Sequence, residues 1–200
     1  MKNIHIGIIA IIIFTVSAYL FVNSNKSENS VTPHDMHRIP DGSLMRNDDT
    51  PMDHMMMRVE SERAFITGMI PHHQEAVNTA KQVLERGGTT AEIKALVENI
   101  ISAQEREIAQ MKAWHEDWYG TPYASDETYH EMMRDLSSLQ GKEIDQAFLE
   151  DMIPHHRGAL MMAESVMPYI EHEEIKKLVE DIQKSQSKEI EDMQKMLEDL

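Results

Sequence analysis

The segment FITGMIPHHQEA at residues 65–76 recurs as FLEDMIPHHRGA at residues 148–159, and this repetition decides the fold. The match extends over residues 65–84 and 148–167, in which 9 of 20 aligned positions are identical. Apolar and small residues recur in both copies at three- and four-residue spacing, which is typical of an amphipathic helix. The chain therefore contains an internal duplication, and each copy predicts a helix of the same kind.

A second pair of matching segments follows the first pair. Residues 93–111 and 175–193 are identical at 10 of 19 aligned positions and again show helical spacing. Each repeat thus predicts two successive helices, which form a helical hairpin. Two such hairpins predict an all-α protein whose domain at residues 58–200 is a four-helix bundle.

Glycine and capping residues mark the ends of the helices in the first repeat. Gly87 and Gly88 end the first helix, and the capping box Thr89-Thr-Ala-Glu92 begins the second. Gly120 ends the second helix, and a short bridging helix is expected near Asp126–Leu136. The connection between the two repeats is therefore expected to be partly helical.

Prolines lie inside and after the helices that carry the repeated motif. In the second repeat, Gly141 precedes the third helix, Pro168 ends it, and the fourth runs from about His172 to the C-terminus. Pro71 and Pro154 lie where the helical pattern continues on both sides. Each either kinks a continuous helix, at a cost of roughly 3 kcal/mol, or occupies the first turn of a new helix, where proline is tolerated. The sequence leaves both interpretations open.

Two adjacent histidines lie on the apolar face of the first helix of each repeat. In the first repeat this face comprises Phe65, Met69, His72, His73, Ala76, Ala80 and Val83. In the second it comprises Phe148, Met152, His155, His156, Ala159, Ala163 and Val166, with Met162 at its edge. One histidine on such a face is usually a core or surface residue, but two matched doublets, each three residues after a methionine, indicate a metal site. The candidate ligands are Met69, His72, His73, Met152, His155, His156 and Met162.

The second helix of each repeat carries polar residues on an otherwise apolar face. Gln104 and Glu107 interrupt this face in the first repeat, as Gln186 and Glu189 do in the second. Burying such groups costs on the order of a few kcal/mol each unless they are paired. The histidines of the facing helix are the nearest candidate partners. The further candidate ligands on these faces are Glu107, Glu189, Met111 and Met193.

Histidine and methionine without cysteine suit a soft monovalent ion. Thioethers bind Cu(I) and Ag(I), and imidazole binds copper as Cu(I) or Cu(II), whereas Zn²⁺ gains nothing from methionine. A di-iron centre is the main alternative, because four-helix bundles build it from Glu and Glu-x-x-His on inward faces. Only Glu127-Thr-Tyr-His130 has that spacing, and it has no partner copy in the other repeat. Copper, and also silver, is therefore the expected ion.

Composition excludes several classes of function. The 200-residue chain has 19 Lys and Arg against 35 Asp and Glu, which gives a formal charge of −16 and makes nucleic acid an unlikely partner. The absence of Cys excludes disulfides, thiolate metal sites and a cysteine nucleophile. The high counts of 17 Met and 11 His exceed what packing requires in a chain of this size.

The N-terminal residues predict a membrane segment. The apolar run from Ile4 to Val22 is roughly 19 residues long, enough to span a bilayer. Val16-Ser17-Ala18 leaves a cleaved signal peptide as the alternative. An uncleaved anchor is favoured because the apolar run continues beyond this point. Both interpretations place the bundle outside the cytoplasm.

Residues 23–57 predict a disordered linker. The segment is polar, is punctuated by Pro and Gly, and has no helical or strand period. Within residues 34–57 it carries His34, Met36, His37, Met45, Met52, His54, Met55, Met56 and Met57. Because these methionines have no core to fill, loose capture of metal ions is the favoured interpretation.

The two motifs MIPHHQEA and MIPHHRGALMMA resemble the paired motifs of the bacterial family catalogued as domain of unknown function 305, and the resemblance covers residues 58–198. That family includes a periplasmic copper-binding protein. The resemblance implies a ferritin-like four-helix bundle, export from the cytoplasm, and binding of copper or silver in metal tolerance. The motif positions carried over are Met69, His72, His73, Met152, His155, His156 and Met162.

The leading hypothesis is a membrane-tethered, extracytoplasmic protein that binds Cu(I) or Ag(I) as a buffer or carrier. No enzyme activity and no catalytic residue are predicted. Metal-transport proteins are the expected partners. The sequence leaves the oligomeric state open. Two alternatives stay open. One is a metal-dependent oxidase of di-iron or copper type. The other is a structural or adaptor bundle whose histidines are hydrogen-bonded and hold no ion.

Overall fold

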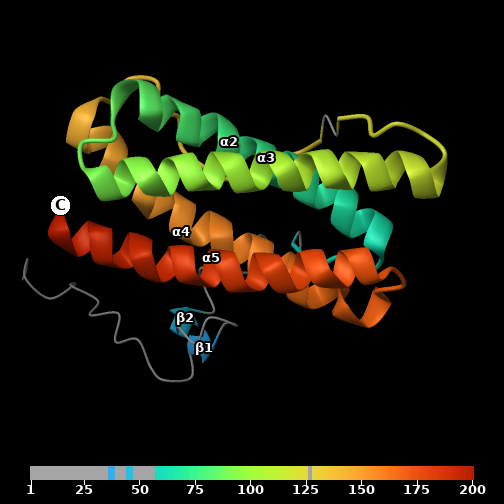
Figure 1. The fold of residues 1–200 in the computed structure, drawn as a ribbon. Helices are drawn as coiled ribbons and strands as arrows, with labels where there is room; N and C mark the ends of the chain where they lie inside the picture. The colour runs from blue at the N-terminus through green and yellow to red at the C-terminus, as the bar shows by residue number, and fades with distance from the viewer. Residues whose placement is uncertain (1–35, 39–43, 47–56, 126–127) are drawn as a thin grey trace, which may run out of the picture. The chain divides into compact units, whose positions relative to one another are not determined.

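The computed structural model describes residues 36–38, 44–46, 57–125 and 128–200, and four long helices dominate this part of the chain (Figure 1). They are α2 (Glu62–Arg86), α3 (Ala91–Tyr119), α4 (Gly141–Val166) and α5 (Glu173–Asp199). A short 3-10 helix, Met167–Tyr169, follows α4. The prediction of two helical hairpins in an all-α bundle is therefore confirmed for residues 57–125 and 128–200.

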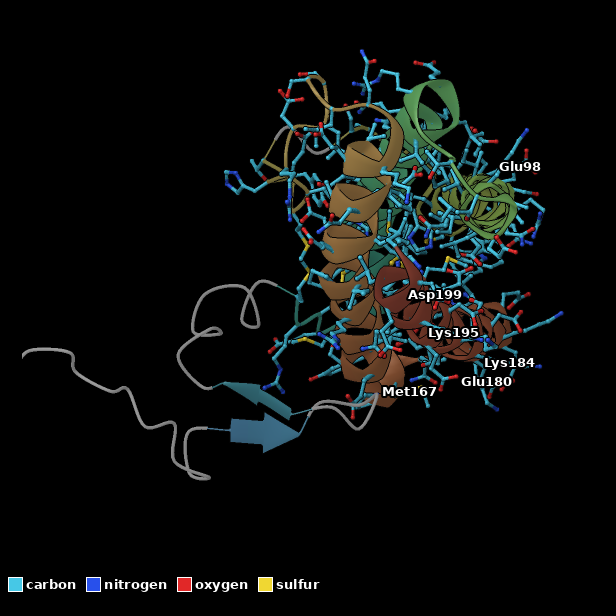
Figure 2. All side chains as sticks on the ribbon, turned by 90° about the vertical axis from the view of Figure 1, so that its left-hand side faces the viewer. Glu98, Met167, Glu180, Lys184, Lys195 and Asp199 are labelled. Atoms are coloured by element: carbon cyan, nitrogen blue, oxygen red, sulfur yellow. The ribbon has the colours of Figure 1, made fainter. Side chains whose placement is uncertain are left out.

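The helices are arranged in two layers, with α2 and α4 in one and α3 and α5 in the other (Figures 1 and 2). Helix α2 packs along α3, α4 packs along α5, and the two hairpins meet mainly through α2 and α4. Helices α3 and α5 touch only slightly, and a groove of about 1090 Å³ runs between them. Among the residues that line this groove are Ala95, Asn99, Ala103, Glu107, Ser185 and Glu189.

Charged side chains cover the outer faces of the α3–α5 layer. In Figure 2 the labelled side chains of Glu180, Lys184 and Lys195 extend from α5 away from the bundle interior, and Glu98 extends likewise from α3. All four residues are exposed. The buried stripes of the helices therefore face inward, as the sequence pattern predicts.

Capping residues begin α2 and α3. The Ser61 hydroxyl accepts a hydrogen bond from the Ala64 N–H at 3.0 Å. The Thr90 hydroxyl accepts one from the Ile93 N–H at 3.2 Å, so Thr90 is the N-cap of α3 and not Thr89 as predicted. Thr89 is displaced from this role because its N–H and hydroxyl both donate to Asp145 in α4.

Two glycines are required by the geometry at the ends of α2 and α3. Gly120 ends α3 in the left-handed conformation with φ of 69°, which favours glycine. Gly87 follows α2 at a close approach to α4, where a Cβ would collide with Oδ1 of Asp145 and lie 2.6 Å from Cγ2 of Ile144. The turn between α2 and α3 can therefore rest directly on the first turn of α4.

The prolines of the histidine motifs lie inside continuous helices. Pro71 is within α2 and Pro154 is within α4, and both helices extend for more than two turns on each side. The interpretation in which a new helix begins at each proline is therefore wrong. Each proline removes one backbone N–H from the helix next to a histidine doublet.

The bridging helix expected near Asp126–Leu136 is absent from the described residues 128–136. The N–H groups of Met132 and Met133 donate instead to Oε1 of Glu75, both at 2.7 Å. A carboxylate of α2 thus takes the backbone donors that a local helix would need. This contact is non-local, so the local sequence pattern did not reveal it.

Two three-residue strands lie within the segment that was predicted to be disordered. Strand β1 (Met36–Arg38) pairs antiparallel with β2 (Leu44–Arg46), with Met36 opposite Arg46. Strands this short show no alternation that a sequence pattern could reveal. The rest of the predicted linker, apart from Met57, lies outside the described residues.

The predicted membrane segment, residues 4–22, also lies outside the described residues. Among the helices of the described ranges, none has the length and hydropathy required to span a bilayer.

The bundle core consists of two apolar clusters, one toward each end. One contains Val83 and Phe148, and the other contains Phe65 and Ile175. The two clusters mainly combine opposite halves of the repeats. In one, residues of α2 after its histidines pack with residues of α4 that mostly precede its histidines, and in the other the order is reversed, with Leu160 and Val77 as exceptions. The histidines consequently lie at the middle of the bundle, between two apolar regions.

Glu62 at the start of α2 closes the loop that leads into α5. Its Oε1 accepts the N–H groups of Glu171 and His172 at 2.6 and 2.7 Å, and its Oε2 lies 2.6 Å from Nδ1 of His172. His172 is the N-cap of α5 but supplies no side-chain cap. The Glu62 carboxylate therefore satisfies backbone donors at the beginning of α5.

We expect Glu62→Gln to lower the free energy of unfolding at pH 7 by about 2 kcal/mol, because hydrogen bonds to a charged group are lost. Burial alone would raise the pKa of Glu62, but the hydrogen bonds from His172 and Glu171 outweigh burial and lower it below 4.5. The carboxylate therefore stabilises the fold fully above pH 4.5, and this contribution is lost as the pH falls through the lowered pKa.

Urea unfolding of the parent and of Glu62→Gln, measured from pH 7 to pH 3, checks this expectation. The difference in the free energy of unfolding between the two proteins should be constant down to about pH 4.5 and should become smaller below that pH. The exposed neighbour Glu60 provides the control, since Glu60→Gln should change little. An equal difference at pH 7 and pH 3 would contradict the assigned role of the carboxylate.

Candidate metal centre

Four buried histidines form a polar layer at the middle of the bundle. His72 and His73 come from α2, and His155 and His156 come from α4. All four are at most 1% exposed. The rings of His72 and His155 contact each other between α2 and α4, with centroids 3.7 Å apart and planes inclined by 36°. The structure thus brings one ring from each repeat together.

The other ring of each doublet is bonded to a glutamate of the neighbouring helix. Nε2 of His73 lies 2.7 Å from Oε2 of Glu107 in α3, and Nε2 of His156 lies 2.6 Å from Oε2 of Glu189 in α5. A carboxylate oxygen accepts a hydrogen bond from each Nε2–H, and in the neutral form of the ring Nδ1 then carries the lone pair. The predicted pairing of these glutamates with the facing histidines is confirmed, whereas a direct ligand role for them stays a prediction.

The two repeats reproduce the same local geometry. In each doublet the ring centroids are 6.4 Å apart and the ring planes are inclined by 53°. The glutamates are also alike, with side chains 16% and 17% exposed. The duplication therefore preserved the arrangement of the side chains as well as the helices.

Six imidazole nitrogens of this layer have no hydrogen-bond partner among the described residues. They are both nitrogens of His72 and of His155, and Nδ1 of His73 and of His156. Nε2 of His155 lies 3.3 Å from Oε2 of Glu75, but the groups are not aligned for a hydrogen bond. A buried polar group left without a partner costs roughly 1–3 kcal/mol. The metal-free layer is therefore costly, and its lone pairs are available to a cation.

Burial keeps the central imidazoles neutral. Burial, together with the nearby rings of His155, His73 and His156, lowers the pKa of His72 well below its usual range. Burial also lowers the pKa of His155, although the contact with Glu75 opposes this shift. Both rings are therefore uncharged at pH 7, and each has one nitrogen with a free lone pair. This is the form of histidine that binds metal ions.

The glutamines on the same faces do not behave as predicted. Gln104 and Gln186 are both 3% exposed, yet Oε1 of each has no hydrogen-bond partner among residues 57–125 and 128–200. They were expected to pair with the histidines, as the glutamates do. The glutamates take the Nε2 positions instead, and the glutamine oxygens add two more buried acceptors without a described donor.

The five methionines predicted as ligands are buried in the two apolar clusters. Met152 and Met193 belong to one cluster, and Met69, Met111 and Met162 belong to the other. Each is at most 3% exposed. Ordinary packing accounts for such positions as well as ligation does. Their role as ligands therefore stays a prediction.

Among residues 57–125 and 128–200, the His, Asp and Glu side chains form no group of three or more that could hold a metal ion as they stand. His130 of the Glu-x-x-His spacing is exposed, and Glu127 lies outside the described residues. An ion in the histidine layer therefore requires donors of another kind, such as thioethers, or a rotation of the rings.

The repeated architecture and the histidine doublets match a known family. Its model, DUF305 (domain of unknown function), matches residues 22–115 and again residues 62–197. The chain belongs to the DUF305 family. The first match includes the doublet His72-His73, and the second includes both doublets. A family model that matches the chain twice agrees with the internal duplication. A search of curated proteins returns no match.

Solved structures of DUF305 proteins and of CopM share this fold. The structure of CopM in the Cu(I)-bound form is 36% identical with a TM-score of 0.63, and the match covers 70% of this chain and 98% of CopM. CopM in the Cu(II)-bound form is 37% identical with a TM-score of 0.63, covering 70% and 97%. A candidate secreted DUF305 protein from Streptomyces coelicolor is 29% identical with a TM-score of 0.61, covering 70% and 92%.

In this DUF305 chain, Glu75 is a central residue that sequence reasoning missed. Besides accepting the N–H groups of Met132 and Met133, its carboxylate accepts the Tyr129 hydroxyl at 2.5 Å and faces His155. Burial alone would raise the pKa of Glu75, but the contact with His155 and the hydrogen bonds from Tyr129 and Met133 lower it. Burial and the hydrogen bond to Glu75 raise the pKa of Tyr129. Glu75 is thus an ionised group beside the central rings.

A signal for Glu75 was present in the alignment of the repeats. Its equivalent in the second repeat is Gly158, so a charged residue stands in one copy where the other has no side chain. Such a difference, three residues after the first histidine of each doublet, indicates that the two halves of the layer are not equivalent.

Proposed function

We propose that this DUF305 protein binds copper outside the cytoplasm, as Cu(I) and also as Ag(I), and that the histidine layer is its principal site in the bundle. The observation that supports this proposal most strongly is the set of six buried imidazole nitrogens without partners. A purely structural layer would hydrogen-bond these nitrogens, because leaving them unpaired lowers stability. A cation bound between the doublets compensates for part of this loss, because it binds the lone pairs of the rings.

The donor chemistry favours copper or silver. Imidazole binds copper in both oxidation states, and thioethers favour the soft monovalent ions. Similarity to CopM, whose structures include Cu(I)-bound, Cu(II)-bound and Ag-bound forms, supports the same choice for this chain. The 200-residue sequence contains no Cys, so His and Met supply the soft donors.

Glu107 and Glu189 orient the outer rings of the doublets. Each holds the hydrogen of its histidine at Nε2 and leaves Nδ1 free, which is the usual arrangement of a carboxylate, a histidine and a metal ion. Both glutamates also line the groove between α3 and α5. With a formal charge of −16, the chain attracts cations over long distances, and this attraction is weakened by salt.

We further propose that the protein stores or carries the ion without chemically transforming it. In this role it is tethered to or released from a membrane outside the cytoplasm, and it exchanges copper with metal-transport proteins. The methionines and histidines of residues 34–57 capture ions loosely, and the bundle holds them more tightly. The similarity to a candidate secreted DUF305 protein supports the extracytoplasmic location.

Anaerobic titration of the full-length chain with Cu(I), in competition with a chromogenic chelator, tests the proposal. We expect the parent to bind tightly and His72→Ala/His155→Ala to bind at least one equivalent fewer, because the central rings are lost. The exposed His130 provides the control, since His130→Ala should bind like the parent. Equal copper binding by the double variant and the parent would show that the bundle site is wrong.

A further inference from the structure

The two histidine doublets differ at one position that decides what faces the central rings. Three residues after His72 the chain has Glu75, whereas three residues after His155 it has Gly158. The Glu75 carboxylate lies 3.3 Å from Nε2 of His155. A Cβ on Gly158 would lie 3.2 Å from Nε2 of His72. One central ring is therefore opposed by a carboxylate, and the other by a position without a side chain.

Two methionines reach the position that Gly158 leaves open. The sulfur of Met57 and the terminal methyl carbon of Met132 each lie 3.6 Å from the point that a Cβ on Gly158 would occupy. Both methionines are only partly buried, and they come from segments before α2 and before α4. An imidazole nitrogen and two thioether side chains from three separate parts of the chain thus converge on one point.

The imidazole at this point, that of His72, is buried and has a lone pair available to a ligand. His72 is 0% exposed, and neither of its nitrogens has a hydrogen-bond partner within the part of the chain that the structure describes. The position of Met132 is fixed by the hydrogen bond from its N–H to Oε1 of Glu75 at 2.7 Å. The same carboxylate supplies a negative charge near the group, which compensates for a cation held by three neutral donors.

We propose that the space over Gly158 is a distinct binding site for a soft monovalent cation, Cu(I) or Ag(I), with Nε2 of His72 and the sulfurs of Met57 and Met132 as ligands. One nitrogen and two thioethers are a neutral, soft donor set that favours these ions over Zn²⁺ and Cu(II). The inference rests on the proposed function, and it assigns two ligands that are not among the core methionines.

The location of the site also connects the methionine-rich segment with the bundle. Met57 follows Met52, Met55 and Met56 in the sequence, and its sulfur lies near the same point as Nε2 of His72. Ligand exchange from these methionines to His72 would pass through Met57. The site is thus placed where an ion leaves the N-terminal segment and enters the histidine layer.

Methyl NMR of the full-length chain, with ¹³C-labelled methionine methyl groups and silver nitrate as the probe, tests the site directly. The Met57 and Met132 signals, assigned by Met57→Leu and Met132→Leu, should shift together as the first equivalents of Ag(I) are added. Leucine has a similar volume, so these variants should keep the fold. An unchanged Met132 signal through saturation would overturn the proposal.

A competition titration with Cu(I) under anaerobic conditions supplies the second measurement. We expect Met57→Leu/Met132→Leu to lower the affinity for one equivalent at least tenfold, and Met167→Leu/Met196→Leu, which alters an exposed and a partly buried methionine elsewhere, to leave it unchanged. Gly158→Ala should lower the affinity for Cu(I) as Met57→Leu/Met132→Leu does, because the methyl group of alanine occupies the site while every ligand remains. Alanine is also favoured over glycine in a helix.

The outcomes separate this site from the proposed function. If the parent binds neither Cu(I) nor Ag(I), the proposed function and this site both fail. If the parent binds them and both Met57→Leu/Met132→Leu and Gly158→Ala bind equally well, only this site fails. Zn²⁺ titration should give the same affinity for the parent and the methionine variants, and a tenfold loss of Zn²⁺ affinity would contradict the soft-ion assignment.

Discussion

Replacing His72 and His155 together by leucine is expected to stabilise the metal-free bundle and to abolish the stabilisation that copper gives. Four ring nitrogens that have no hydrogen-bond partner in the described ranges disappear, each costing roughly 1–3 kcal/mol when buried. Leucine fills a similar volume between the two apolar clusters. The Glu75 carboxylate keeps its hydrogen bonds from Tyr129, Met132 and Met133. We therefore expect the free energy of unfolding to rise by roughly 2 kcal/mol without metal.

Thermal unfolding with and without Cu(I) under anaerobic conditions measures both effects. An ion that binds only the native parent stabilises it by about 2.7 kcal/mol at a free concentration one hundred times Kd, and this increment should be lost in the leucine variant.

A matched control comes from the other two rings. In His73→Leu/His156→Leu the carboxylates of Glu107 and Glu189 lose their partners, so this variant should be less stable than the parent without metal. If the variant at positions 72 and 155 is strongly destabilised in the metal-free state, the central rings hold the apo fold together, and the structural interpretation of the layer is favoured.

Asp145→Ala is expected to lower the free energy of unfolding by about 3 kcal/mol, because three hydrogen bonds from the turn between α2 and α3 are lost and each contributes roughly 1 kcal/mol. Asp145 is 0% exposed. Its Oδ1 accepts the Gly88 N–H at 2.6 Å, and its Oδ2 accepts the N–H and the hydroxyl of Thr89 at 2.8 and 2.6 Å. Alanine leaves these three donors without an acceptor and leaves a cavity beside Gly87.

Urea unfolding at pH 7 checks this value. The stability of Asp145→Asn should lie between those of the parent and of Asp145→Ala. The amide oxygen of asparagine still accepts hydrogen bonds on one side, while its NH₂ group faces a donor on the other. Asp192 in α5 provides the control, since it forms an exposed pair with Lys188 and Asp192→Ala should change stability by less than about 1 kcal/mol. A loss below 1 kcal/mol for Asp145→Ala would contradict the assigned role.

The helices were predictable from local spacing, and the pairing of His73 with Glu107 was predictable because both residues lie on the inward faces of successive helices in one repeat. Apolar spacing and the duplication identify the helices, and the cost of burying a carboxylate identifies a partner on the facing helix. The fate of Pro71 could not be predicted, because a proline early in a helix and a proline inside one have the same local pattern. Only the packing of the whole of α2 distinguishes them.

The errors concern residues whose contacts are distant in sequence. Thr89 has the expected capping sequence, but Asp145, far along the chain, takes its hydroxyl and shifts the cap to Thr90. The segment around Met132 was expected to be helical, but the Glu75 carboxylate takes its N–H groups. In both cases a buried carboxylate competes with local secondary structure, and sequence periodicity contains no information on such pairs.

The weak contact between α3 and α5 has a consequence for the dynamics of the loaded protein. The two hairpins meet mainly through α2 and α4, at the level where the rings of His72 and His155 touch. An ion bonded to both rings is then a reversible cross-link between the two halves of the duplication. Copper would slow the parting of the hairpins more than it slows fraying within either one, so amide hydrogens along the α2–α4 seam would gain the most protection from exchange.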